Sequence, residues 1–333
     1  MKKIIRSICV FSEKPTTVIE KLNEIQHMLV GKGFEVQTLR ICSNSIERPK
    51  EGWGEILTCI GVPSLEDAIK NRDKFFIEPD LSMNLDLTNS KISLSEVDYL
   101  FEIIRTDAKK TFNFAYVFNN QPSSPYFPSA TYSKEGFSIG LQTTDLSDGC
   151  KTLEEWFDKL RLVWMEIDEL FKNDKGYLGI DSSIAPVFQG QSSLVNLIKR
   201  LGPTFKESVL SDIYLRTTKF IKENNPKPIG LCGLMFPCLE DFELAEEYEK
   251  GEFTLERNLF LSLHSGLGVD TYPIGIDEDP KKILDILKTV QGLSNKYKKP
   301  LSVRFVSDGK AKIGEKTDFK NQYLKDVIIR AIK

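Results

Sequence analysis

The chain has 333 residues, a net charge of −3 and 28% charged residues, which is an ordinary balance for a globular protein with a sizeable core. This balance provides no general attraction to nucleic acid or to an anionic membrane, and we expect neither partner. No apolar run approaches the ~20 residues of a membrane-spanning helix. The six cysteines are widely spaced and form no C-x-x-C pair, which indicates reduced thiols and a cytoplasmic protein.

The N-terminal part of the chain predicts a β-α-β unit, which is usually parallel. Residues 2–11 are expected to form a strand rather than a signal peptide, because Arg6 and Ser7 interrupt the apolar run. Pro15 opens a helix that ends near Gly31. The next strand is expected over residues 35–44.

Strands and helices continue to alternate through the rest of the sequence, which favours an α/β fold. Ser93 and Glu96 form a capping-box pattern. No internal repeat or low-complexity linker divides the chain, so residues 1–333 are expected to form a single domain. The remaining predicted elements are helix and loop over 51–73, strand 76–85, helix 93–109, strand 112–120, a strand within 131–142, helix 153–172, strand 177–186, helices 191–201 and 205–224, strand 228–236, helices 239–250 and 254–264, strand 269–275, helix 280–296, strand 301–307 and a terminal helix over 320–332.

Polar residues follow two of the predicted strands, where ligands meet parallel α/β sheets. Asp181 lies in an otherwise apolar stretch and is followed by Ser182. A carboxylate there must be paired, hydrogen-bonded or used in chemistry, and a loop cap and a catalytic role are equally open. Glu240 and Asp241 follow Cys238 at a helix start, where acidic groups serve as caps or as acid/base catalysts. A reactive Cys238 is the weaker alternative, because no histidine lies nearby in sequence.

The segment LHSGLGVDT, residues 263–271, is the third candidate. It contains His264, one of two histidines, together with Ser265, Gly266 and Asp270. Its glycines permit close approach to a ligand. The segment lacks the third glycine of a dinucleotide fingerprint and precedes a strand, so it does not match that motif.

Several blocks of the sequence carry a family resemblance: PYFPSATYSKEGFSIGLQ, GIDSSIAP, GLCGLMFPCLEDFELAEEYEKGEF, LHSGLGVDTYPIG and KKPLSVRFV. Together they resemble the uncharacterised family known as domain of unknown function 711, over nearly the whole chain. The resemblance implies a pyruvate formate-lyase-like fold, an α/β barrel of two largely parallel half-barrels surrounded by helices. The C-terminal part, with SDGKAKIGEK, lacks the R-V-x-G-[FY] loop of glycyl radical enzymes. Radical chemistry at Cys232 or Cys238 is therefore not expected.

We expect a non-radical enzyme, a hydrolase or lyase, that acts on a small polar metabolite in the cavity of the barrel. No cofactor is identified, and a divalent hard cation is the option compatible with oxygen ligands. Glycoside hydrolysis by two cavity carboxylates and a non-catalytic receptor that holds an anion through arginines are the alternatives; a homo-oligomer is also open. The expected catalytic residues are Asp181, Glu240, His264 and Asp270, and the expected substrate-binding residues are Arg40, Ser182, Asp241, Ser265, Gly266 and Arg304.

Overall fold

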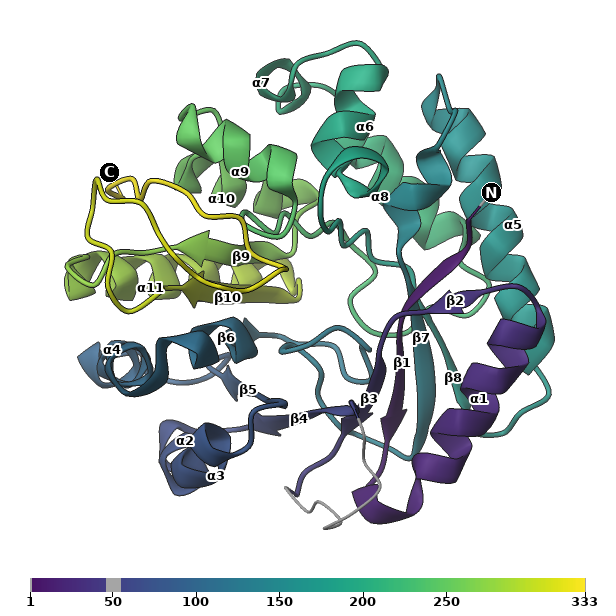
Figure 1. Ribbon diagram of the computed structural model, residues 1–333, viewed down its shortest axis with the longest axis horizontal. Coiled ribbons are helices and arrows are strands. Elements are labelled where there is room, and N and C mark those ends of the chain that lie inside the picture. The colour runs from purple at the N-terminus through teal and green to yellow at the C-terminus, as the bar shows by residue number, and fades with distance from the viewer. Residues whose placement is uncertain (1, 46–54, 333) are drawn as a thin grey trace.

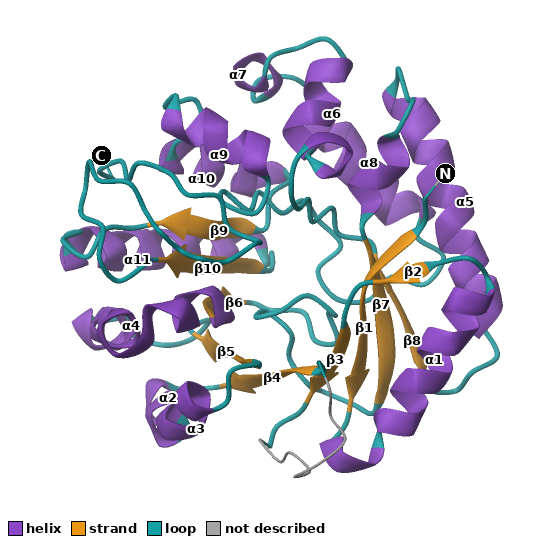
Figure 2. Ribbon diagram, viewed as in Figure 1, coloured by secondary structure: helices purple, strands orange, loops and turns teal. Residues whose placement is uncertain are grey.

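A mixed ten-stranded β-sheet organises the molecule, and helices surround it (Figures 1 and 2). The computed structural model describes residues 2–45 and 55–332. The strands are β1 (Ile4–Phe11), β2 (Glu35–Val36), β3 (Leu39–Cys42), β4 (Leu57–Val62), β5 (Leu81–Asp86), β6 (Phe114–Phe118), β7 (Gly136–Leu141), β8 (Tyr177–Asp181), β9 (Gly268–Pro273) and β10 (Leu301–Val306).

The strands fall into two groups that run in opposite directions. Their order is β8-β7-β1-β3-β4-β5-β6-β10-β9, with β2 paired to β1. Strands β1 and β3 to β6 are mutually parallel, as are β7 with β8 and β9 with β10. The pairs β1–β7 and β6–β10 are antiparallel and join the groups. Each rim of the sheet therefore combines strand starts from one group with strand ends from the other.

Residues 228–237 lie between the two terminal strands of this order. Parallel bridges join Ile180 to Pro228 and Ile184 to Leu234 on one side, and Leu234 to Gly266 and Pro237 to Asp270 on the other. Gly230 and Cys232 have φ angles of 72° and 45°, which a regular strand does not contain. The predicted strand 228–236 is thus an irregular segment with isolated bridges.

The helices bury one face each against the sheet or one another. In α5, Thr152 accepts a hydrogen bond from the Glu155 N–H, and Trp156 and Trp164 are buried, as the spacing of the sequence predicts. The capping box of Ser93 and Glu96 is also confirmed. None of the described helices is long and apolar enough to cross a membrane. The α-helices are α1 (Ile19–Gly31), α2 (Leu65–Lys70), α3 (Arg72–Ile77), α4 (Leu94–Asp107), α5 (Leu153–Phe171), α6 (Leu194–Arg200), α7 (Phe205–Ser208), α8 (Ile213–Asn224), α9 (Phe242–Glu249), α10 (Leu255–His264) and α11 (Pro280–Tyr297).

Three further predicted elements are wrong. Strand β4 falls within the helix-and-loop stretch predicted over 51–73 (residues 51–54 lie outside the described residues), because its short apolar run has no periodicity to distinguish it from a helix. The helix predicted over 205–224 is divided into α7 and α8. The described residues 320–332 contain no helix. There Val327 and Ile329 are buried while Ile328 is exposed, an alternation typical of extended chain.

Candidate active site

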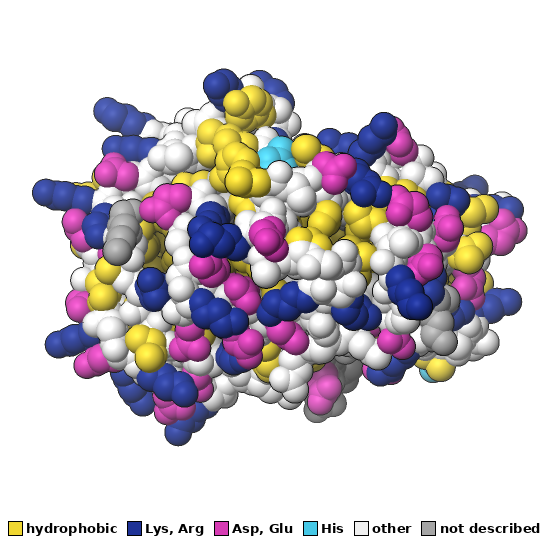
Figure 3. Space-filling view, turned by 90° about the horizontal axis from the view of Figure 1, so that it is seen from above, with side chains coloured by type: hydrophobic (Ala, Val, Ile, Leu, Met, Phe, Trp, Pro, Cys, Tyr) yellow, Lys and Arg dark blue, Asp and Glu magenta, His cyan; other side chains and the backbone are white. Residues whose placement is uncertain are grey.

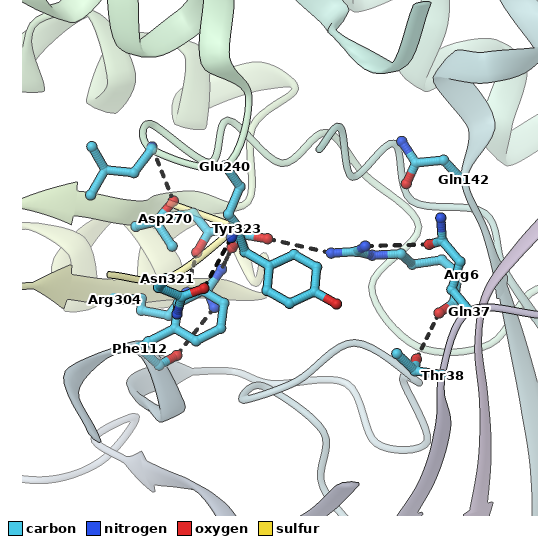
Figure 4. Close-up of polar contacts among 12 residues, drawn as sticks. Arg6, Gln37, Thr38, Phe112, Gln142, Glu240, Asp270, Arg304, Asn321 and Tyr323 are labelled. Carbon is cyan, nitrogen blue, oxygen red and sulfur yellow. Dashed lines mark hydrogen bonds and ion pairs between the residues drawn. The ribbon is translucent and has the colours of Figure 1, made fainter. Parts of the chain in front are cut away.

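Several charged side chains form a cluster around Arg304, which belongs to β10 (Figure 4). Its Nε lies 2.6 Å from Asp270 Oδ1, and its Nη2 contacts Glu240 Oε1. Asp270 belongs to the neighbouring strand β9, and Glu240 follows the segment that bridges to Asp270 at Pro237. Three sequence segments that lie side by side thus contribute one charge each.

The pairing of β9 with β10 is irregular where these charges meet. Val303 pairs with Val269 and Phe305 with Tyr272, so Arg304 faces two residues of β9 rather than one. The second of them, Thr271, has a φ of 39°, an unfavourable angle for a β-branched residue. A bulge of this kind re-aims the side chains beside it. Here it lies at the Asp270–Arg304 ion pair.

Two further arginines reach the cluster from the other group of strands. Arg6 in β1 lies 3.5 Å from Glu240, between its Nη2 and the Oε2 of the carboxylate. Arg40 in β3 donates from Nη1 to the Pro125 carbonyl at 3.0 Å and from Nε to Thr38 Oγ1 at 3.0 Å. No carboxylate among residues 2–45 and 55–332 forms an ion pair with Arg40, although it is only 7% exposed.

The five charged groups line one cavity of about 50 Å³. A wider pocket of about 530 Å³ shares Arg6 and Arg40 with this cavity. The ring of Tyr323, from the C-terminal segment, lies 5.9 Å from the Arg6 guanidinium and stacks on Phe112 at 6.4 Å. The inner cavity holds a few water molecules at most, so a ligand with a small charged group fits it and any larger part would extend into the wider pocket.

The electrostatics favour an anion. With all five groups ionised, three arginines outnumber two carboxylates and the lining has a net charge of +1. Burial raises the pKa of Glu240, although Arg304 opposes that rise. Burial and the nearby Arg6 lower the pKa of Arg40 to about 10, which still leaves it charged at neutral pH. A charge of this kind without a counter-ion is costly inside a protein.

Asp181 and Ser182 do not line this cavity; their side chains form hydrogen bonds within the neighbouring segments of the chain. Asp181 is fully buried, and its carboxylate accepts N–H groups of Leu231 at 2.9 Å, Cys232 at 3.1 Å and Ser183 at 3.0 Å. Ser182 Oγ accepts a hydrogen bond from Asn225 Nδ2 at 2.8 Å. Asp181 therefore holds the irregular segment around Cys232, which is the loop-cap alternative of the sequence prediction.

Asp241 is also tied to the main chain. Its carboxylate accepts the N–H of Leu244, as the N-cap of α9, and the N–H of Leu194 at 2.9 Å. Burial raises the pKa of Asp241 to about 7. Burial also raises the pKa of the neighbouring Cys238 thiol well above its ordinary value, which opposes its use as a nucleophile.

His264, Ser265 and Gly266 lie in a different place from the charged cluster. His264 Nδ1 is 2.8 Å from Ser265 Oγ, and both line a separate groove at the ends of α8, α10 and α11. A Cβ added at Gly266 would lie 3.1 Å from the Ser262 N, so this glycine allows close packing against α10. Of the residues predicted to share one hollow, the structure unites Glu240, Asp270, Arg40 and Arg304.

Metal binding receives no support from the described part of the chain, where no three His, Cys, Asp or Glu side chains are grouped to hold an ion. The two carboxylates of the cavity instead bind Arg304. Arg6 and Tyr323 were not predicted as site residues. The sequence contained a signal for Arg6, because a charged residue interrupts the apolar run of β1. It contained none for Tyr323, which lies in a segment predicted as helix.

Comparison with known protein families gives one match. The family described as Uncharacterised ACR (DUF711) matches residues 61–320. This range includes Glu240, Asp270 and Arg304, whereas Arg6 and Arg40 precede it. No curated protein matches the chain.

Proposed function

The chain belongs to the DUF711 family, and from that premise we propose that it is an enzyme acting on a small anionic metabolite held between Arg40 and Glu240. The observation that carries the proposal is Arg40, a buried cation that has no carboxylate partner among the described residues and lines the cavity. A carboxylate or phosphate group of the ligand would supply the missing counter-charge, because a guanidinium forms charge-assisted hydrogen bonds with both.

Glu240 is the proposed acid/base group. Its Oε1 is bound by Arg304, whereas within residues 2–45 and 55–332 Oε2 has only the 3.5 Å contact with Arg6. Oε2 is therefore the oxygen that is free to carry a proton, and the burial that raises the pKa of Glu240 favours that proton. Proton transfer between Oε2 and an atom next to the ligand's anionic group would support a lyase or hydrolase reaction.

The proposed fold is a closed barrel similar to pyruvate formate-lyase, without its radical loop. The parallel bridges that residues 228–237 make with both β8 and β9 support closure, and the two opposed groups of strands support two half-barrels. In such a barrel, Arg6 and Arg40 would face Glu240, Asp270 and Arg304 across the interior.

The test is ligand binding by calorimetry with inorganic phosphate, malonate and succinate as probes. We expect at least one probe to bind the wild-type chain, and Arg40→Met to weaken it by about ten-fold or more, the effect of losing a hydrogen bond to a charged group. Arg105→Met is the matched control, because Arg105 is exposed on α4. Equal binding by the Arg40 and Arg105 variants would contradict the proposal.

A receptor without catalysis is the second candidate, and the ion pairs of both carboxylates with Arg304 favour it. The Glu240→Gln variant distinguishes the two candidates. If this variant still binds the ligand but no longer converts it, the result supports an enzyme. If the wild-type chain binds the ligand and does not convert it, the result supports a receptor. Glycoside hydrolysis is less favoured, because one guanidinium contacts both carboxylates and leaves no space for a sugar ring between them.

A further inference from the structure

A second concave site lies outside the charged cluster, where α8, α10 and α11 end. This groove has a volume of about 310 Å³, within the range of small-molecule sites. Its basic lining residues are Lys222, His264, Lys298 and Lys299, and we call it the lysine groove.

The charges of the lysine groove are all of one sign. No aspartate or glutamate lines it, and none of its three lysines forms an ion pair with a carboxylate in the described ranges. Lys299 Nζ donates to the Ser262 carbonyl at 2.9 Å, an uncharged acceptor. Burial and the neighbouring Lys222 lower the pKa of Lys299 to about 8. Burial and Lys299 also lower the pKa of His264.

Helix ends account for part of this arrangement. Lys222 lies in the last turn of α8, His264 ends α10 and Lys298 caps α11, where cations offset the partial negative charge of a helix C-terminus. That partial charge is about half a unit per helix. Three helix ends therefore offset roughly half of the charge of three lysines, and the groove retains a positive excess.

Apolar side chains adjoin the cations. Leu263 and Tyr297 line the groove and are 39% and 50% exposed. Phe260, one turn before His264 on α10, is 41% exposed, and its ring lies 5.4 Å from the imidazole. In the view from above, hydrophobic side chains gather beside a histidine (Figure 3).

We propose that the lysine groove binds a small amphipathic carboxylate. Lys222 and Lys299 would hold its charged head, and Leu263 and Tyr297 would cover its apolar body. Charge complementarity selects an anion as the occupant. A second copy of the chain with the same face would bring lysines against lysines, which is unfavourable.

Octanoate is the probe for the test. Acetate is the control that has the carboxylate without the long alkyl chain, and 1-octanol is the control that has the alkyl chain without the charge. Calorimetry on the full chain should show one octanoate site and much weaker binding of acetate and octanol. Lys299→Met and Lys222→Met, which retain the aliphatic stem, should each weaken octanoate by about ten-fold or more. Lys288→Met on α11 is the matched control, because Lys288 is exposed and outside the groove.

A second readout locates the ligand. The chain has two histidines, His27 and His264, so their imidazole signals can be assigned by comparison with His27→Gln. Octanoate should raise the pKa of His264, since a nearby anion favours the imidazolium, and should leave His27 unchanged. Absence of octanoate binding, equal binding by the Lys299 and Lys288 variants, or loss of binding in Arg40→Met, which would assign octanoate to the charged cluster, would each overturn the proposal.

Discussion

The surroundings of Asp181 and of Glu240 illustrate two uses of a buried carboxylate. Asp181 accepts main-chain N–H groups of Leu231 and Cys232, whereas Glu240 contacts the guanidinium groups of Arg304 and Arg6. Main-chain donors fix the local fold and cannot move away. Side-chain donors around a cavity can exchange one anion for another, so the identity of the donor separates a structural carboxylate from a candidate functional one.

The largest effect is expected from removing the cation of the charged cluster. Arg304→Met leaves the buried Glu240 and the partly buried Asp270 without their shared partner, and we expect the free energy of unfolding to fall by about 3–5 kcal/mol. Urea denaturation measures this loss. The triple variant Arg304→Met, Glu240→Gln and Asp270→Asn is the control. If it regains much of the lost stability, the loss comes from the two carboxylates left without a cation. If it is as unstable as Arg304→Met alone, this explanation is wrong.

A pH effect at Asp241 tests a third buried carboxylate, which has main-chain donors. Because burial raises its pKa in the folded state to about 7, the folded chain binds a proton that the unfolded chain has already lost between about pH 4 and 7. Stability therefore falls as pH rises through this window, by roughly 2–4 kcal/mol. Asp241→Asn retains a capping side chain and should show a smaller fall between pH 5 and 8. An equal fall in both proteins would assign the titration to another group.

Asp181→Ala should be less damaging than Arg304→Met. It leaves the N–H groups of Leu231 and Cys232 without their acceptor, and we expect a loss of about 2–3 kcal/mol. Hydrogen exchange at these two amides should accelerate relative to amides of α5. Unchanged exchange there would show that Asp181 does not hold the segment.

The smallest effect on stability is expected for Arg40→Met. Replacing a buried cation that has no carboxylate partner in the described ranges by an apolar side chain of similar length should change the free energy of unfolding by less than about 1 kcal/mol, even though it weakens anion binding. A loss as large as that of Arg304→Met would show that Arg40 is a structural cation, which would remove the contrast between the two arginines.

Local signals predicted most of the fold and four of the five charged residues of the candidate site. The capping box at Ser93 and the buried stripe of α5 depend on neighbouring residues and are visible in sequence. The pairing of Glu240 with Arg304 depends on which strands become neighbours, which no local pattern determines. His264 was misplaced for a geometric reason: it precedes β9, so it lies at the opposite rim from residues that follow strands of the same direction as β9.

The opposed directions of the two strand groups have a consequence for engineering. Arg6 and Arg40 project from strands whose backbones are committed to ladder hydrogen bonds, whereas Glu240 follows an irregular segment. Asp270 and Arg304 also belong to strands, so exchanging loops would alter only Glu240 among the five charged groups of the cavity. The other four would have to be redesigned inside the strands, where each substitution must also satisfy the packing of the sheet.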